Sequence, residues 1–90
     1  MNEQLCIQKF NNIGLVAEFF EPQGCIVGGT KRTQDEFLTI FKYKFQICPK
    51  DEKWMIEVPG PGQFITTKEA DSLSDSFDYV SNYYRDHGWI

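Results

Sequence analysis

The residues best suited to nucleophilic catalysis or metal binding are few and widely spaced. The chain has three cysteines and one histidine, Cys6, Cys25, Cys48 and His87. Three thiolates and an imidazole can hold Zn²⁺, but structural zinc sites normally draw ligands from close pairs such as C-x₂-C, and these residues are scattered. No spacing pairs the histidine with a particular cysteine, as a base is paired with its nucleophile. The pattern predicts buried thiols, without a metal site or a catalytic residue.

A second candidate for chemistry is the glycine-containing stretch VPGPGQFITTKEA, residues 58–70. A nucleotide-binding loop needs consecutive backbone N–H donors, with Lys and Ser or Thr directly after its last glycine. Pro59 and Pro61 contribute no N–H, and Gln63 stands where the lysine belongs. The stretch therefore predicts a strand-to-strand turn with no bound cofactor. Its second half, residues 66–69, matches a capping box and predicts that a helix begins there.

Apolar residues recur at helical spacing after this cap, at Ala70, Leu73, Phe77, Val80 and Tyr84. Their stripe suits a helix of about 20 residues that lies across a sheet. Gly88 fits a left-handed stop, after which Trp89 can fold back onto the last turn. We expect one C-terminal helix whose apolar side faces the core.

The opposite side of this helix is acidic and is bordered by aromatic side chains. The residues expected to contact a partner are Asp71, Asp75, Asp78, Tyr79, Tyr83 and Trp89. Charge runs on a helix usually serve solvation, but repeated aspartates weaken a helix slightly, which favours a binding role. Tyr and Trp are common interface anchors, and they also seal small cores. Both alternatives stay open for these aromatic residues.

Basic residues gather in another part of the chain. Residues 31–53 hold six basic and four acidic side chains, whereas the remainder holds three basic and nine acidic ones. Lys42, Lys44, Lys50 and Lys53 could form a cationic surface for nucleic acid. The interleaved aromatic residues would face the other way on a strand, where they could not stack on bases beside these lysines. The net charge of −4 also disfavours nucleic acid as the partner.

One long stretch has the alternation of a β-strand. In residues 37–48, one face is shared by Phe37, Thr39, Phe41, Tyr43, Phe45 and Ile47. Leu38 and Ile40 fall on the lysine side, and residues 33–36 match a capping box, but the composition favours a strand. Residues 54–58 alternate in the same way and predict a hairpin with this strand through a charged loop.

Shorter strands are expected on either side of this hairpin. Residues 5–7 alternate with polar neighbours and, together with residues 13–20, predict a first hairpin. A turn at residues 21–24 leads to a strand at 25–27, and residues 63–65 form a last short strand.

These elements predict an α+β fold: an antiparallel β-meander of about five or six strands, with one C-terminal helix packed on one face. A chain of 90 residues without an internal linker indicates a single domain, residues 1–90. One helix cannot cover a wide sheet. The uncovered apolar surface should therefore curl into a partial barrel or be buried against a second copy or another protein.

The sequence also bears on location. No stretch approaches the roughly 18 consecutive apolar residues of a membrane-spanning helix. The beginning, MNEQLCIQKF, lacks the pattern of a signal peptide. An odd number of cysteines without close spacing is a poor disulfide framework. We therefore expect a cytoplasmic location without membrane association.

These observations favour a small non-enzymatic interaction protein, such as a regulator, an inhibitor or an accessory subunit, that uses the acidic helix. Its partner would be another protein with a basic or mixed surface, and a homodimer is a further alternative. The competing hypothesis is a nucleic-acid-directed module that uses residues 42–53. An enzyme is the least favoured class, because no set of residues can be assigned catalytic roles.

Overall fold

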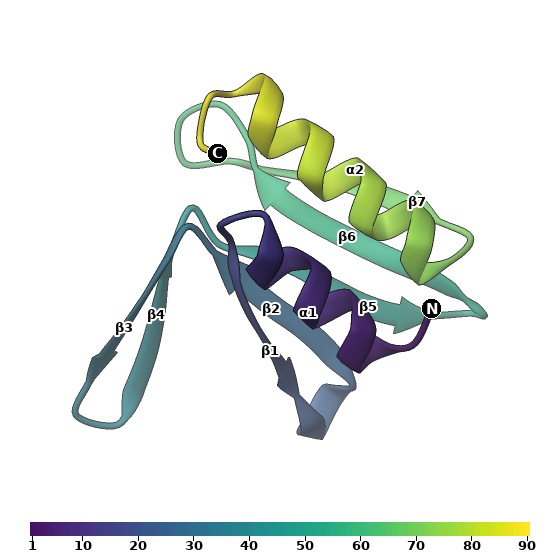
Figure 1. Cartoon of the computed structure of the whole chain (residues 1–90), viewed down its shortest axis with the longest axis horizontal. Helices are drawn as coiled ribbons and strands as arrows, with labels where there is room; N and C mark the ends of the chain where they lie inside the picture. Colours follow the sequence, from purple (N-terminus) through teal and green to yellow (C-terminus); the bar gives the residue numbers. More distant parts are fainter.

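The computed structural model describes residues 1–90 as two layers, a β-sheet with both helices on one of its faces (Figure 1). In chain order the elements are α1 (Glu3–Asn12), β1 (Val16–Phe20), the 3₁₀ turn η1 (Glu21–Gln23), β2 (Cys25–Gly29), β3 (Lys31–Asp35), β4 (Leu38–Lys42), β5 (Phe45–Lys50), β6 (Lys53–Pro59), β7 (Ile65–Ala70) and α2 (Leu73–Asp86). Five strands form one antiparallel sheet in the order β1-β2-β5-β6-β7, while β3 and β4 form a separate two-stranded hairpin. The predicted α+β class, with a C-terminal helix packed on an antiparallel sheet, is confirmed.

The first element is a helix, so the hairpin predicted for the beginning of the chain is wrong. The Asn2 side chain accepts a hydrogen bond from the Leu5 N–H at 2.8 Å and caps α1. Cys6 and Phe10, which lie one helical turn apart, are buried and define the apolar side of α1. The alternation at residues 5–7 is too short to distinguish a strand from a helix.

The strand predicted for residues 37–48 is divided into β4 and β5 by a bend. Both halves belong to one ribbon with a continuous register. In every residue pair of β3–β4 and of β2–β5 the two residue numbers have the same sum, so the pairing does not shift between the halves. The bend lies at Tyr43, whose φ of 49° is in the left-handed region. The prediction of one continuous strand is therefore wrong at this position, although both halves are β-structure.

The predicted hairpin of β5 and β6 is confirmed. Ile47 pairs with Ile56, and the charged turn is Asp51–Glu52, in which both residues have positive φ. The turn predicted at residues 21–24 is also confirmed, as η1 followed by Gly24 with φ 68°. These turns depend on adjacent residues, so packing elsewhere does not override them.

The start of the C-terminal helix differs from the prediction. Residues 66–69 belong to β7, which pairs with β6 along its whole length. The helix begins after Ser72, whose hydroxyl accepts a hydrogen bond from the Asp75 N–H at 3.0 Å. The strand ladder and the β-branched Thr66 and Thr67 outweigh the capping box. α2 therefore has 14 residues, fewer than predicted.

The end of α2 matches the prediction. The Trp89 N–H donates to the Tyr84 carbonyl at 2.9 Å, and the Gly88 N–H donates to the Arg85 carbonyl at 3.0 Å. Gly88 has a φ of 73°, which glycine adopts without strain. This arrangement is a Schellman motif, and it returns Trp89 to the last turn of the helix.

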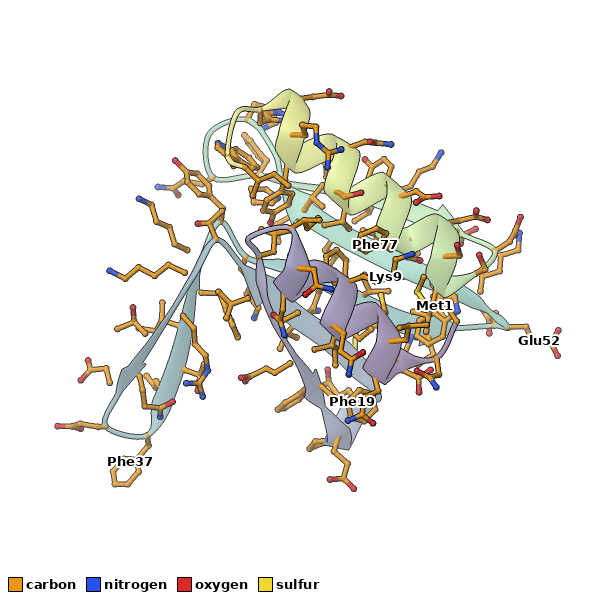
Figure 2. All side chains as sticks on the ribbon, viewed as in Figure 1. Met1, Lys9, Phe19, Phe37, Glu52 and Phe77 are labelled. Carbon is orange, nitrogen blue, oxygen red and sulfur yellow. A yellow bond between two sulfur atoms is a disulfide. The ribbon has the colours of Figure 1, made fainter.

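The core lies between the helices and the sheet. Phe45 of β5 meets Phe10 of α1 with 4.8 Å between ring centroids, and it meets Tyr84 of α2 with 5.8 Å. The two helices touch where the Lys9 ammonium lies 5.0 Å from the centroid of the Phe77 ring (Figure 2). The other face of the sheet carries no helix (Figure 1). No helix of the chain combines the length and the apolar character needed to cross a membrane.

Cys25 and Cys48 form a disulfide between the neighbouring strands β2 and β5. The prediction of buried thiols is therefore wrong for this pair. Cys6 is the free cysteine, and it is buried under α1. Burial raises the pKa of its thiol from 9.0 to about 11, although the nearby Lys9 charge acts in the opposite direction.

Candidate functional site

The β3–β4 hairpin, residues 31–42, projects from the sheet, and we call it the arm. Its tip lies far from both chain ends (Figure 1). Three of its apolar side chains face solvent: Phe37 is 95% exposed, Leu38 67% and Ile40 51%. In Figure 2, Phe37 points away from the rest of the molecule. A two-stranded hairpin is only marginally stable alone in water, so the arm is the strongest candidate for a contact surface.

The base of the arm is held by a close approach between backbones. A Cβ on Gly29 would lie 2.3 Å from the Lys42 carbonyl oxygen, so a larger residue does not fit there. The Thr30 N–H donates to the same oxygen at 2.8 Å, and the Thr30 hydroxyl donates to it at 3.2 Å. The junction between arm and sheet is therefore well defined.

The end of α2 holds the bend at Tyr43. The Tyr84 hydroxyl donates a hydrogen bond to the Tyr43 carbonyl, across a sequence separation of 41 residues. The Trp89 ring stacks on the Tyr43 ring with 4.4 Å between centroids. Burial raises the pKa of Tyr84, so its hydroxyl remains a donor over the neutral range. The direction of the arm thus depends on residues near the C-terminus.

Strand pairing gives the arm two different faces, because directly opposite residues of an antiparallel pair point to the same side. The inner face carries Arg32, Gln34, Thr39 and Phe41, and the outer face carries Lys31, Thr33, Asp35, Leu38, Ile40 and Lys42. The inner face turns toward the uncovered side of the sheet, where Arg32 Nε lies 2.9 Å from the Glu18 carboxylate of β1. The six outer-face residues are all exposed.

The inner face and the uncovered side of the sheet enclose a hollow of about 300 Å³, which we call the arm groove. Its lining includes Phe20, Val27, Phe37, Phe41, Lys44 and Gln46. This volume is at the small end of ligand sites, and polar and apolar side chains contribute about equally to the lining. The groove therefore has room for one or two side chains of a partner.

A second hollow of about 310 Å³ adjoins the arm groove, because Lys44 and Gln46 line both. Its far wall is the loop between β6 and β7 together with the first residue of β7, where Phe64 is 78% exposed and Ile65 63%. Glu57 also lines this hollow and accepts a hydrogen bond from Gln46 at 3.3 Å. The two hollows form a trough with exposed apolar residues at both ends.

A short polar chain orients the arm over the groove. Thr39 donates to the Gln34 side chain at 2.7 Å, and Arg32 donates to the same oxygen at 3.4 Å while pairing with Glu18. All these groups are exposed or half-exposed, so the ion pair contributes only about 0–1 kcal/mol to stability. Its effect is to fix the distance between the arm and β1.

The acidic residues predicted to bind a partner lie on two elements. Asp75 and Asp78 are exposed on α2. Asp71 precedes the helix, and its carboxylate lies 3.6 Å from the Lys53 ammonium. The three carboxylates therefore do not form one continuous stripe on the helix.

The aromatic residues predicted to bind a partner are all half-buried. The Tyr83 hydroxyl donates to the Pro59 carbonyl at 2.5 Å, and its ring stacks on His87 with 4.2 Å between centroids. Trp89 packs on the bend at the base of the arm. Burial raises the pKa of Tyr79. Tyr83 and Trp89 thus already have contacts within the chain.

The four lysines of the nucleic-acid alternative do not share one surface. Lys42 lies on the outer face of the arm, and Lys44 lines the arm groove. Lys50 and Lys53 flank the turn at the opposite end of β5, where Lys53 pairs with Asp71. No group of three or more His, Cys, Asp or Glu side chains in residues 1–90 is placed to hold a metal ion.

The sequence contains one signal for the arm. Leu38 and Ile40 interrupt the alternation of the predicted strand and place apolar side chains beside the lysines. A strand with a single buried face has no reason to carry apolar residues on its other face. This irregularity indicates a second contact surface, but it gives no indication of the bend that exposes it.

Comparison of the chain with protein-family models, with curated proteins and with solved structures finds no match in any of the three.

Proposed function

We propose that the chain is a small non-enzymatic protein-interaction module, acting as a regulator, an inhibitor or an accessory subunit, with the arm groove and the arm tip as its main contact surface. The observation that carries this proposal is Phe37, 95% exposed beside a hollow that apolar and polar side chains line together. Aromatic side chains beside preformed pockets commonly supply most of the binding energy of an interface. Because the base of the arm is already fixed by hydrogen bonds, the arm loses less conformational entropy on binding.

The partner in this proposal is a protein with a basic or mixed surface around an apolar side chain. Asp35 and Glu36 precede Phe37 at the arm tip, and neither forms an ion pair within the chain. Glu57, in the adjoining hollow, also has no basic partner. Basic side chains around the inserted residue would meet these carboxylates and would accelerate association at low salt.

The acidic side of α2 serves as an additional contact for the same partner. Asp75 and Asp78 are exposed and form no ion pair, so they are available to a basic surface. The helix offers fewer free anchors than the arm, because Tyr83 and Trp89 are engaged within the chain. We therefore assign the main contact to the arm groove.

The disulfide supports an oxidising location for the chain, in place of the cytoplasmic one expected from the sequence. Disulfides persist in extracellular and periplasmic environments, and thioredoxin and glutathione reduce them in the cytosol. Thiol counting on freshly isolated, denatured protein tests this proposal. One reactive thiol supports it, and three reactive thiols contradict it.

The test of the function uses the tagged chain as bait in an extract of its own source, treated with nuclease. The wild-type chain should capture a stoichiometric protein partner, and Phe37→Ser should weaken its binding by about tenfold or more. Leu5→Ser is the matched control, because it removes another exposed apolar side chain, on α1. This control should bind as the wild type does.

The combined variant Asp75→Asn with Asp78→Asn separates the two contact surfaces. A loss of binding in this variant, with full binding by Phe37→Ser, would place the contact on α2 and would contradict the arm groove as the main site. Capture that disappears on nuclease treatment would favour the nucleic-acid alternative. A bait that captures nothing would contradict the interaction module itself.

A further inference from the structure

Apart from Asp35 at the tip, the outer face of the arm takes no part in the proposed function, which uses the inner face and the tip. We infer that this outer face binds the same face of a second copy of the chain, with the two arms antiparallel and related by a two-fold axis. The contact goes beyond the proposed function, and it leaves the arm groove open to another partner.

Leu38, opposite Asp35 at the tip, and Ile40, at the centre, are the apolar side chains of the outer face. They are 67% and 51% exposed, and all six residues of this face are accessible to solvent. The five-stranded sheet is covered by two helices on its apolar face, whereas the arm has no second layer (Figure 1). A two-stranded ribbon gains stability when another layer packs on its apolar face, and a second arm supplies such a layer.

The charges of the arm are separated along its length. Lys31 and Lys42 are paired at the base, whereas Asp35 and Glu36 lie at the tip. None of the four forms an ion pair within the chain. A cationic base and an anionic tip complement each other when two arms run in opposite directions, and they repel when the arms run in the same direction.

The geometry of the ribbon allows these contacts to form together. The Thr33–Ile40 pair lies midway between the base pair and the tip pair of the outer face. A two-fold axis that crosses the ribbon at this point places Ile40 against Ile40 of the second copy. It also places Lys31 against Asp35 of the second copy and Lys42 against Leu38 of the second copy, and the reverse. Base and tip are about 14 Å apart at ~3.4 Å per residue, so the two ion pairs flank the apolar centre.

Packing of the outer face on the outer face of a second copy accounts for its apolar and charged residues better than other contacts do. Pairing of the arm edges would satisfy backbone groups but would leave Leu38 and Ile40 in water. An unrelated partner would need the opposite charge order and an apolar centre at matching spacing. A second copy has this pattern by symmetry, because a two-fold contact requires only that the surface complement itself.

The proposed contact is small. A two-stranded face about 14 Å long buries less than the roughly 800 Å² per partner of a stable interface. The dimer therefore belongs to the weak and transient class, with a Kd in the micromolar range or above. Its ion pairs are exposed, so salt should weaken it.

The test is sedimentation equilibrium of the full chain at low salt, from about 10 μM to about 1 mM. One variant reverses the charge at the base of the arm, Lys31→Glu with Lys42→Glu. Another reverses the charge at the tip, Asp35→Lys with Glu36→Lys. Each variant alone should self-associate at least about tenfold more weakly, because like charges then face each other. An equimolar mixture of the two should form a heterodimer near wild-type affinity, since the acidic base of one meets the basic tip of the other.

The matched control for the base variant is Lys50→Glu with Lys68→Glu, which makes the same change in net charge outside the arm. It should dimerise as the wild type does, and circular dichroism should show that every variant is folded. The inference is overturned if the wild type stays monomeric over the whole range, if the arm variants dimerise like the wild type, or if their mixture stays monomeric. The groove proposal survives each of these results, because the Phe37→Ser assay measures the inner side of the arm.

Discussion

The arm and the five-stranded sheet are parts of one ribbon, yet only the sheet has a core. Phe45 and Ile47 of β5 are fully buried, whereas Leu38 and Ile40 of β4 are largely exposed. Both halves are rich in β-branched and aromatic residues and share one register. The difference lies in what packs on them, two helices in one case and solvent in the other (Figure 1). Alternation thus predicts that a strand has a face to cover, but it does not predict what covers it.

The largest expected effect comes from making the same substitution in both halves of the ribbon. Ile47→Ala should lower the free energy of unfolding by about 2–5 kcal/mol, because it leaves a cavity in the core. Ile40→Ala in dilute protein should change it by no more than about 0.5 kcal/mol. Urea denaturation measures both values. Similar losses in the two variants would show that the arm has a core of its own.

Reduction of the disulfide should weaken the sheet more than the arm. The Cys25–Cys48 bond closes a loop with a sequence separation of 23 residues. Its loss should cost about 3 kcal/mol, through the greater freedom of the unfolded chain. Thermal unfolding with and without reductant measures this cost. Adding reductant to the Cys25→Ala, Cys48→Ala variant is the control, and any further loss there would point to another cause.

Alkaline pH should also act on the core and spare the arm. The unfolded chain loses the Cys6 proton near pH 9, whereas the folded chain keeps it until about pH 11. The stabilisation from the neutral thiol is therefore complete below pH 9 and is lost as pH rises to 11. Its size is on the order of 2 kcal/mol.

Denaturation curves between pH 8 and pH 10 measure the first part of this loss free of Tyr84, because that buried residue adds a loss of the same sign only above its ordinary pKa of 10.0. Cys6→Ala should have lower stability at pH 8 but a flatter profile. An unchanged slope in this variant would rule out Cys6 as the source.

The smallest expected effect tests where the arm ends and the sheet begins. Tyr84→Phe removes the hydrogen bond to the Tyr43 carbonyl at the base of the arm. It should lower the free energy of unfolding by about 1 kcal/mol. Hydrogen exchange should become faster at the Thr30 amide, which closes the base, and should stay slow at Ile47. Equal acceleration at both amides would mean that Tyr84 supports the core and has no particular role at the arm.

The sequence predicted those parts of the fold whose signals are local. The turn at residues 21–24 and the stop at Gly88 are set by adjacent residues, and the β5–β6 hairpin by strong alternation on both sides of its turn. The N-terminal helix was missed because its burial depends on Phe10 meeting Phe45, far away in the sequence. The start of α2 was misplaced because pairing with β6 converts residues 66–69 into a strand.

The candidate site was less predictable, because it arises from distant contacts. The arm leaves the sheet where Gly29 passes close to Lys42 and where Tyr84 holds Tyr43. Neither contact has a signature in neighbouring residues. Trp89, one of the residues predicted to contact a partner, packs on this bend.

The disulfide also determines what a protease can do to this molecule. Cys25 and Cys48 lie on either side of the arm, so every peptide bond of the arm falls within the loop that they close. Cleavage at the exposed turn, residues 36–37, would nick the chain without releasing a fragment. The product would run as one band on a non-reducing gel and as two bands after reduction. A protein cleaved there would persist as a covalently joined pair of fragments, and only a reducing environment would let them separate.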